Sequence, residues 1–121
     1  MTVTPDEWSA RLRDPNSKQT TQRLRRGDGM CCLGHLGDLI DPEAWEYRYH
    51  DRLWNGLFAT LDGYGPDWLT DRERDTAVSL NDTYGWTLPQ IADWNDAGRP
   101  TTVIHHSELA ELAAKQKVTD A

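Results

Sequence analysis

Three helix starts are marked in this sequence by the same short motif, and they limit the fold more than any other feature. In a capping box, a Thr side chain accepts a hydrogen bond from the backbone three residues later, and a Glu or Gln at that position reaches back. The motif predicts helices that begin after Thr4, Thr70 and Thr87. The first helix should end near Asp14-Pro15, and a fourth should follow Ser107, a suitable N-cap residue.

Strand signals are weaker and occupy less of the chain. Aromatic and polar residues alternate over residues 45–50, which is typical of a strand with one buried face. Residues 19–26 alternate less clearly and could supply a partner strand, and Val103-Ile104-His105 is a third short candidate. We therefore expect an α+β fold, a helix-dominated single domain over residues 1–121 with a small antiparallel sheet, in which residues 115–121 form a fraying C-terminal tail.

Composition predicts a small aromatic core. Only 37% of the 121 residues are hydrophobic, but six Trp and four Tyr supply large burial areas per residue. The sequence holds no run of about 20 apolar residues and no apolar signal-peptide core, so we expect a soluble cytoplasmic protein that does not associate with membranes. The two cysteines are adjacent, which favours reduced thiols over a disulfide.

Charge argues against one function class. The formal net charge is -7, whereas a general nucleic-acid binder needs a basic face to displace counterions from phosphates. Basic residues are nevertheless concentrated between positions 11 and 26, where six accompany a single acidic residue. We interpret this segment chiefly as a face that is solvated or ion-paired with the acidic remainder, and alternatively as a contact for an anionic partner.

The segment around the cysteines holds the residues best suited to chemistry. If residues 31–40 are helical, Cys31, His35 and Asp38 lie on one side of the helix. A thiol at a helix start feels the positive end of the helix dipole, which lowers its pKa, and His35 could then act as the base. One hypothesis is therefore a thiol-dependent enzyme in which Cys31 or Cys32 is the nucleophile and Asp38 or Asp93 orients the base.

The same residues also fit a buried structural helix, which is the interpretation we favour. Leucines and Ile40 surround much of its circumference, and small Cys and Gly residues suit tight contacts. Glycine inside a helix lowers its stability, so Gly34 and Gly37 predict a neighbour that approaches the backbone closely. Another segment of the protein is favoured over a ligand as that neighbour.

Metal binding is not supported by the spacing of the possible ligands. Cys31, Cys32, His35, His105 and His106 are chemically suitable for zinc. Adjacent cysteines, however, seldom bind one tetrahedral ion, and the sequence has no second cysteine pair. We therefore expect no metal and no other cofactor.

A second polar cluster lies where two expected helices are joined. Asn81 and Asp82 could close the first helix, or they could form a polar pocket with the cysteine segment. Asp93, in the next helix, suits the helix dipole and could also bond a ligand or the backbone of the cysteine segment. The candidate ligand-binding residues are thus Cys32, His35, Asn81, Asp82 and Asp93.

Two strings of the sequence stand out together. They are Gly29-Met30-Cys31-Cys32-Leu33-Gly34-His35-Leu36-Gly37-Asp38-Leu39, and Leu80-Asn81-Asp82 followed by Ile91-Ala92-Asp93-Trp94. Together they resemble a family of small phage and prophage proteins, and the resemblance covers about positions 19–96, including Gln22, Leu24 and Arg25. The chain departs from the family pattern at Gly37, where a Cys is common, and at residues 86–88. A role that needs the later thiol therefore does not carry over.

The resemblance implies a phage accessory protein of the host cytoplasm rather than a virion component or a housekeeping enzyme, and it brings no established activity with it. We expect a non-catalytic binding protein that captures a host protein or a small nucleotide-like ligand, because the polar residues do not make a complete catalytic set. The thiol-dependent enzyme is the first alternative. An inhibitor whose acidic surface mimics nucleic acid is the second. The sequence leaves the oligomeric state open.

Overall fold

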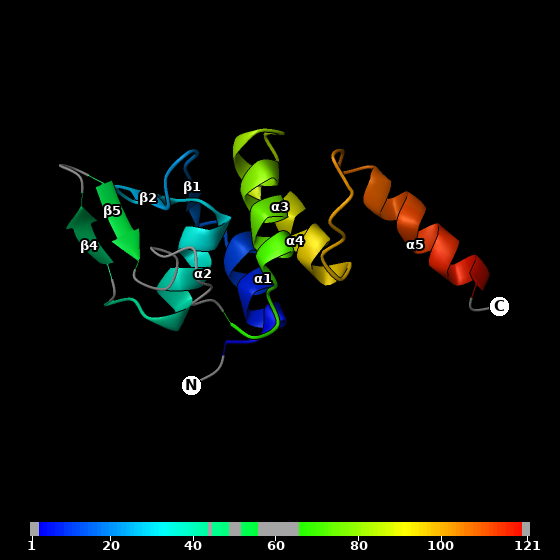
Figure 1. Cartoon of the computed structure of the whole chain (residues 1–121), viewed down its shortest axis with the longest axis horizontal. Coiled ribbons are helices and arrows are strands. Elements are labelled where there is room, and N and C mark those ends of the chain that lie inside the picture. The colour runs from blue at the N-terminus through cyan, green and yellow to red at the C-terminus, as the bar shows by residue number, and fades with distance from the viewer. Residues whose placement is uncertain (1–2, 44, 49–51, 56–65, 120–121) are drawn as a thin grey trace.

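The computed structural model describes residues 3–43, 45–48, 52–55 and 66–119. The helices are α1 Pro5–Arg13, α2 Cys32–Ile40, α3 Asp71–Asp82, α4 Leu88–Asp96 and α5 Glu108–Thr119, and the strands are β1 Lys18–Gln19, β2 Arg25–Arg26, β3 Gly29–Met30, β4 Trp45–Arg48 and β5 Arg52–Asn55. Helices α1, α3 and α4 lie in the centre of the molecule, with the strands on one side and α5 on the other (Figure 1). This helix-dominated architecture with a small sheet confirms the predicted α+β class.

All three predicted capping boxes are formed. Thr4, Thr70 and Thr87 each accept from the backbone N–H three residues later, and the Glu or Gln there accepts from the backbone N–H of the Thr. Helix α1 ends at Arg13 with Asp14 as its C-cap. Helix α5 begins directly after Ser107, and its backbone is helical through Thr119. The helix starts were therefore encoded locally.

The sheet is mixed, which corrects the prediction of a purely antiparallel one. Its strand order is β1-β3-β2-β5-β4, and β1 pairs with β3 in parallel, whereas the other neighbours are antiparallel. The chain reverses between β2 and β3 at a tight turn where Gly27 has φ +60°. Strand β3 lies between β2 and β1 in the sheet. It runs antiparallel to β2 and parallel to β1.

The strand predicted over residues 19–26 is wrong as one continuous element. Only its two ends are strands, since the chain bends over residues 21–24. Gln22 sits at the bend with φ +65°, and its backbone N–H donates to Asp82 at 2.9 Å. A bond to the end of α3 thus takes the place of a ladder bond at this position.

The strand predicted at Val103-Ile104-His105 is also wrong. The backbone N–H groups of Ile104 and His105 donate to the Glu108 carboxylate, at 3.4 and 3.0 Å. These bonds connect the segment to the first turn of α5 instead of to a sheet. The strand predicted to begin at Trp45 is confirmed as β4, and residues 49–50 of that prediction lie outside the described residues.

Tryptophans join the helices, as the composition predicts. Trp8 and Trp94 are fully buried, and their ring centroids are 6.4 Å apart in an edge-to-face arrangement. The indole N–H of Trp8 donates to the backbone oxygen of Cys32 at 2.9 Å. Helix α1 therefore contacts both α4 and α2, which brings the cysteine segment into the core.

Part of the basic segment is ion-paired, as expected. Arg11 bonds Asp38 at 2.7 Å, and Arg13 lies between Asp93 and Asp96 at 2.6 and 2.7 Å. These pairs fix α1 to α2 and to α4, although each is partly exposed and contributes only about 0.5 kcal/mol. Among the helices of the described ranges, none is long and apolar enough to cross a membrane.

Candidate functional site

Helix α2 is the buried helix that the cysteine segment predicts. Cys31 is its N-cap, and the Cys31 Sγ accepts from the backbone N–H of Gly34 at 3.4 Å. Every residue from Cys32 to Gly37 is buried. The sulfur of Cys31 therefore serves as a helix cap.

Both thiols are held in their protonated form. Cys31 is 7% exposed and Cys32 is fully buried. Burial raises the pKa of the Cys31 thiol to about 11 and the pKa of the Cys32 thiol well above its ordinary value. The expectation of a lowered thiol pKa is thus wrong, because burial outweighs the backbone hydrogen bonds at the helix start that would lower it. The thiol-dependent enzyme lacks an activated nucleophile in this structure.

His35 is neutral and has a partner for each ring nitrogen. Its Nε2 lies 2.8 Å from the backbone oxygen of Lys18 and donates to it, and its Nδ1 accepts from Arg11 Nε at 3.1 Å. Burial lowers the pKa of His35, and the nearby Arg11 charge acts in the same direction. The imidazole therefore connects α2 to α1 and β1 and does not bond a thiol.

Asp38 completes the polar side of α2. Its carboxylate accepts from Arg11 at 2.7 Å and from Trp45 Nε1 at 3.0 Å. Burial alone would raise the pKa of Asp38, but the hydrogen bonds from Trp45 and Arg11 outweigh it and hold the pKa below its ordinary value. Cys31, His35 and Asp38 thus share one helix without forming a proton relay.

Asn81 is the centre of a buried hydrogen-bond network. Its Oδ1 accepts from Gln19 Nε2 at 2.9 Å and from the backbone N–H of Cys32 at 3.3 Å. Its Nδ2 donates to the backbone oxygen of Thr20 at 3.0 Å and to the Asp82 carboxylate at 2.7 Å. The Asn81 side chain is only 1% exposed, and its Oδ1 and Nδ2 atoms each make two hydrogen bonds within the protein. Asn81 therefore connects α3 to the start of α2 and to β1.

The loop over residues 20–24, which we call the bridging loop, is the close neighbour that Gly34 requires. A Cβ at Gly34 would overlap the backbone oxygen of Leu24 and lie 3.1 Å from the Cβ of Met30. The same Leu24 oxygen accepts from the backbone N–H of Cys31 at 3.1 Å. The prediction that another protein segment approaches α2 closely is confirmed at Gly34, and for Gly37 it stays a prediction.

Asp93 lies apart from the rest of the predicted site. Its carboxylate accepts from Arg13 at 2.6 Å and from His106 Nε2 at 2.8 Å. Burial would raise the pKa of Asp93, but these bonds lower it overall. Its partners come from α1 and from the segment before α5, so the structure does not place Asp93 beside the cysteine helix.

The candidate residues therefore divide into two groups. Cys32, His35 and Asn81 are at most 1% exposed and bond to other parts of the protein, so a ligand would have to displace those contacts to reach them. Asp82 and Asp93 are partly exposed. Within the ranges that the structure describes, no group of three or more His, Cys, Asp or Glu side chains could hold a metal ion.

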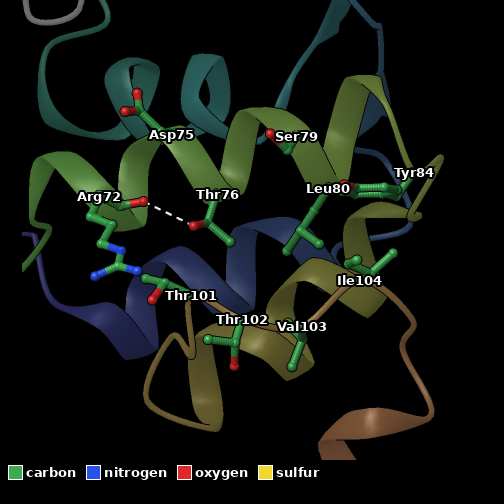
Figure 2. Close-up of a pocket in the computed structure, with 10 residues that line it drawn as sticks. All are labelled: Arg72, Asp75, Thr76, Ser79, Leu80, Tyr84, Thr101, Thr102, Val103 and Ile104. Carbon is green, nitrogen blue, oxygen red and sulfur yellow. Dashed lines mark hydrogen bonds between the residues drawn. The ribbon is translucent and has the colours of Figure 1, made fainter.

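A groove that the sequence analysis missed runs between α3 and the chain before α5. This groove, the α3 groove, has a volume of about 330 Å³ and is shown in Figure 2. Tyr84 and Ile104 are 45% and 42% exposed beside it. Its lining residues are Arg72, Asp75, Thr76, Ser79, Leu80, Tyr84, Thr101, Thr102, Val103 and Ile104. No short motif marks this groove, although the strand predicted at Val103-Ile104-His105 falls on its edge.

We expect the free energy of unfolding to fall as the pH is lowered from 7 to 5. The folded pKa of His35 is below its ordinary value of about 6.5, so the unfolded state binds more protons in this window. Urea unfolding at pH 7, 6 and 5 measures the effect. His35→Gln should flatten the profile, whereas His105→Gln, at an exposed position, should not. A flat wild-type profile would contradict a neutral, buried imidazole.

Comparison with known protein families, with curated proteins and with solved structures finds no match. The geometry of the described residues is thus the basis for the function proposed below.

Proposed function

We propose that this chain is a non-catalytic binding protein, a phage accessory protein that acts by capturing a host protein. One observation carries the non-catalytic part. The thiols, imidazole and carboxamide that could do chemistry are buried, hydrogen-bonded to the protein itself, and held with the thiols protonated. The phage part rests on the resemblance of the cysteine and Asn81 segments to phage and prophage proteins.

Among the described residues, the α3 groove is the hollow that we propose for binding. Two large hydrophobic side chains, Tyr84 and Ile104, are more than 40% exposed beside it. Exposed apolar side chains next to polar ones are typical of a contact surface for another protein. A small nucleotide-like ligand is the second occupant to test, because Tyr84 could stack on a base.

The proposal is tested by capture followed by titration with purified components. Folded protein on beads is exposed to a bacterial lysate, with urea-unfolded protein as the control, and the retained protein is identified and purified. We expect calorimetry to give a saturable complex, and intact masses of both proteins to stay unchanged. Binding of the unfolded control alone, or turnover of the captured protein by catalytic amounts of this chain, would contradict the proposal. A nucleotide panel in thermal-shift assays tests the small-ligand alternative.

A further inference from the structure

The sheet carries a row of basic residues that crosses all five of its strands. From β1 to β4 in the order of the sheet, the row consists of Lys18, Gly29, Arg26, Arg52 and Arg48. The register pairs Gly29 with both Lys18 and Arg26. It also pairs Arg52 with Arg48. Strands β2 and β5 pair one position away, at Arg25 and Leu53, so the same antiparallel register continues the row from β2 to β5. Residues paired in this way lie on one face of a sheet, and we call this set the cationic row.

The cationic row lies on the face of the sheet opposite to the one that contacts the helices. The neighbouring row has Gln19 on β1 and Met30 on β3, and it belongs to the other face. Met30 is 7% exposed, and Gln19 Nε2 donates to Asn81 of α3 at 2.9 Å. Lys18 and Arg26 are exposed instead. These two cations are therefore accessible to a partner.

Lys18 and Arg26 also lack a strong acidic partner. Among the described residues, the Arg26 side chain has no hydrogen-bond or ion-pair partner. Lys18 Nζ lies 3.9 Å from the Asp28 carboxylate, but the two side chains are 69% and 86% exposed, so water screens this pair strongly. Arg11 and Arg13, by contrast, bond carboxylates at 2.7 and 2.6 Å. The basic segment thus pairs two of its charges within the protein and keeps Lys18 and Arg26 available for a partner.

The cationic row places like charges next to each other. Arg48 and Arg52 are directly opposite in the register, an arrangement that destabilises a sheet and that an anion would compensate. Gly29 has no side chain, so none separates Lys18 from Arg26. The row spans about 19 Å, which is long enough for about three carboxylates on alternate residues of an extended segment. Guanidinium groups bind carboxylates through two parallel hydrogen bonds. A partner with several carboxylates close together therefore fits the row.

From these observations we infer that the cationic row binds an acidic segment of the captured protein. The formal net charge of the chain is -7 even with the four cations of the row included. A nucleic acid longer than the row would therefore run onto acidic surface and be repelled, whereas an acidic segment of a folded protein can end where the row ends. The inference rests on the proposed function, and it adds to the α3 groove a second surface that fixes the charge of the partner.

The test titrates a fluorescein-labelled oligo-glutamate peptide with the whole folded chain and follows the anisotropy at about 0.1 M salt, where exposed charges act over about 10 Å. Lys18→Gln and Arg26→Gln should each weaken binding at least about threefold, and Arg26→Glu at least about tenfold. The matched control is Lys117→Gln on α5, which removes the same charge from the other side of the molecule (Figure 1). It should change the affinity less than about twofold.

A further variant separates loss of the site from loss of the fold. Arg52→Gln removes one member of the like-charged pair, so we expect the Tm of the free protein to stay equal or to rise. Binding of oligo-glutamate should nevertheless weaken at least about threefold. A lowered Tm together with unchanged binding would overturn the inference.

Two comparison ligands decide the class of the partner. Oligo-glutamine of the same length should not bind, and single-stranded oligo-thymidine should bind more weakly than oligo-glutamate. Tighter binding of oligo-thymidine, no binding of oligo-glutamate, or binding that ignores Arg26→Glu would overturn the inference. If a captured host protein still binds Arg26→Glu as tightly as the wild type, the proposed function stands and the cationic row is not its site. If no protein is captured but oligo-glutamate binding depends on Arg26, the proposed function fails and the row is still a site for carboxylates.

Discussion

Replacing Gly34 with Ala is expected to lower the free energy of unfolding by about 3 kcal/mol or more. A Cβ there would overlap the Leu24 oxygen and lie 3.0 Å from the Leu24 carbonyl carbon. The bridging loop cannot retreat cheaply, because that oxygen also accepts from the Cys31 backbone. Urea unfolding measures the change, and failure to fold is the extreme form of the same result.

The sign of this effect distinguishes packing from helix propensity. Ala is favoured over Gly in a helix interior by about 1 kcal/mol, so propensity alone would make Gly34→Ala stabilising. The matched control is Gly98→Ala, where no atom lies within 4 Å of a Cβ but φ is +87°. That substitution should cost about 1 kcal/mol from backbone strain. If Gly34→Ala is no worse than Gly98→Ala, the close approach of the bridging loop does not exist.

The second large effect is expected for Asn81→Asp, which should lower the free energy of unfolding by about 3 kcal/mol. The change keeps the shape of the side chain but replaces the Nδ2 donor with an oxygen. That oxygen would face the Thr20 backbone oxygen and the Asp82 carboxylate, and a buried charge would be added. Urea unfolding at pH 7 is the measurement.

A control with the same chemical change is available at the surface. Asn16 is exposed, and Asn16→Asp should alter the free energy of unfolding by less than about 0.5 kcal/mol. If Asn81→Asp left the free energy of unfolding unchanged and weakened partner binding, Asn81 would be a ligand-binding residue, as the sequence alone predicts.

The helices could be predicted because their signals are local. Thr4, Thr70 and Thr87 each begin a capping box that is complete within four residues. The burial of α2 is indicated by the leucines and glycines of its own sequence. The strands at residues 18–30 are two residues each, too short for a period-two pattern. Their pairing depends on the bend at Gln22, which is fixed by Asp82 from sixty positions away.

The sequence predicts that Asn81 and the cysteine helix lie together, but it does not predict which groups bond to the Asn81 side chain. The sequence correctly brings Asn81 close to the cysteine helix, where its Oδ1 meets the Cys32 backbone. It could not show that Gln19 and Thr20 would occupy the remaining hydrogen-bond positions of the amide. Those partners lie 62 and 61 positions from Asn81, and no short motif reports contacts of that range.

The α3 groove was missed for the same reason. It is assembled from α3 and from the segment after α4, and neither part is a motif by itself. Thr102, Val103 and Ile104 do not alternate in polarity, so nothing local shows that Val103 is buried between two exposed neighbours.

The most direct measurement of the central claim, that the cysteine helix is structural, is the rate of iodoacetamide labelling of the native protein as a function of pH. With the pKa of Cys31 raised to about 11 and that of Cys32 well above its ordinary value, we expect labelling at pH 8 to be more than about 100-fold slower than for the same chain unfolded in urea. Native labelling as fast as that of the unfolded chain, with a midpoint at or below about 8.5, would show an accessible, activated thiol and contradict the account.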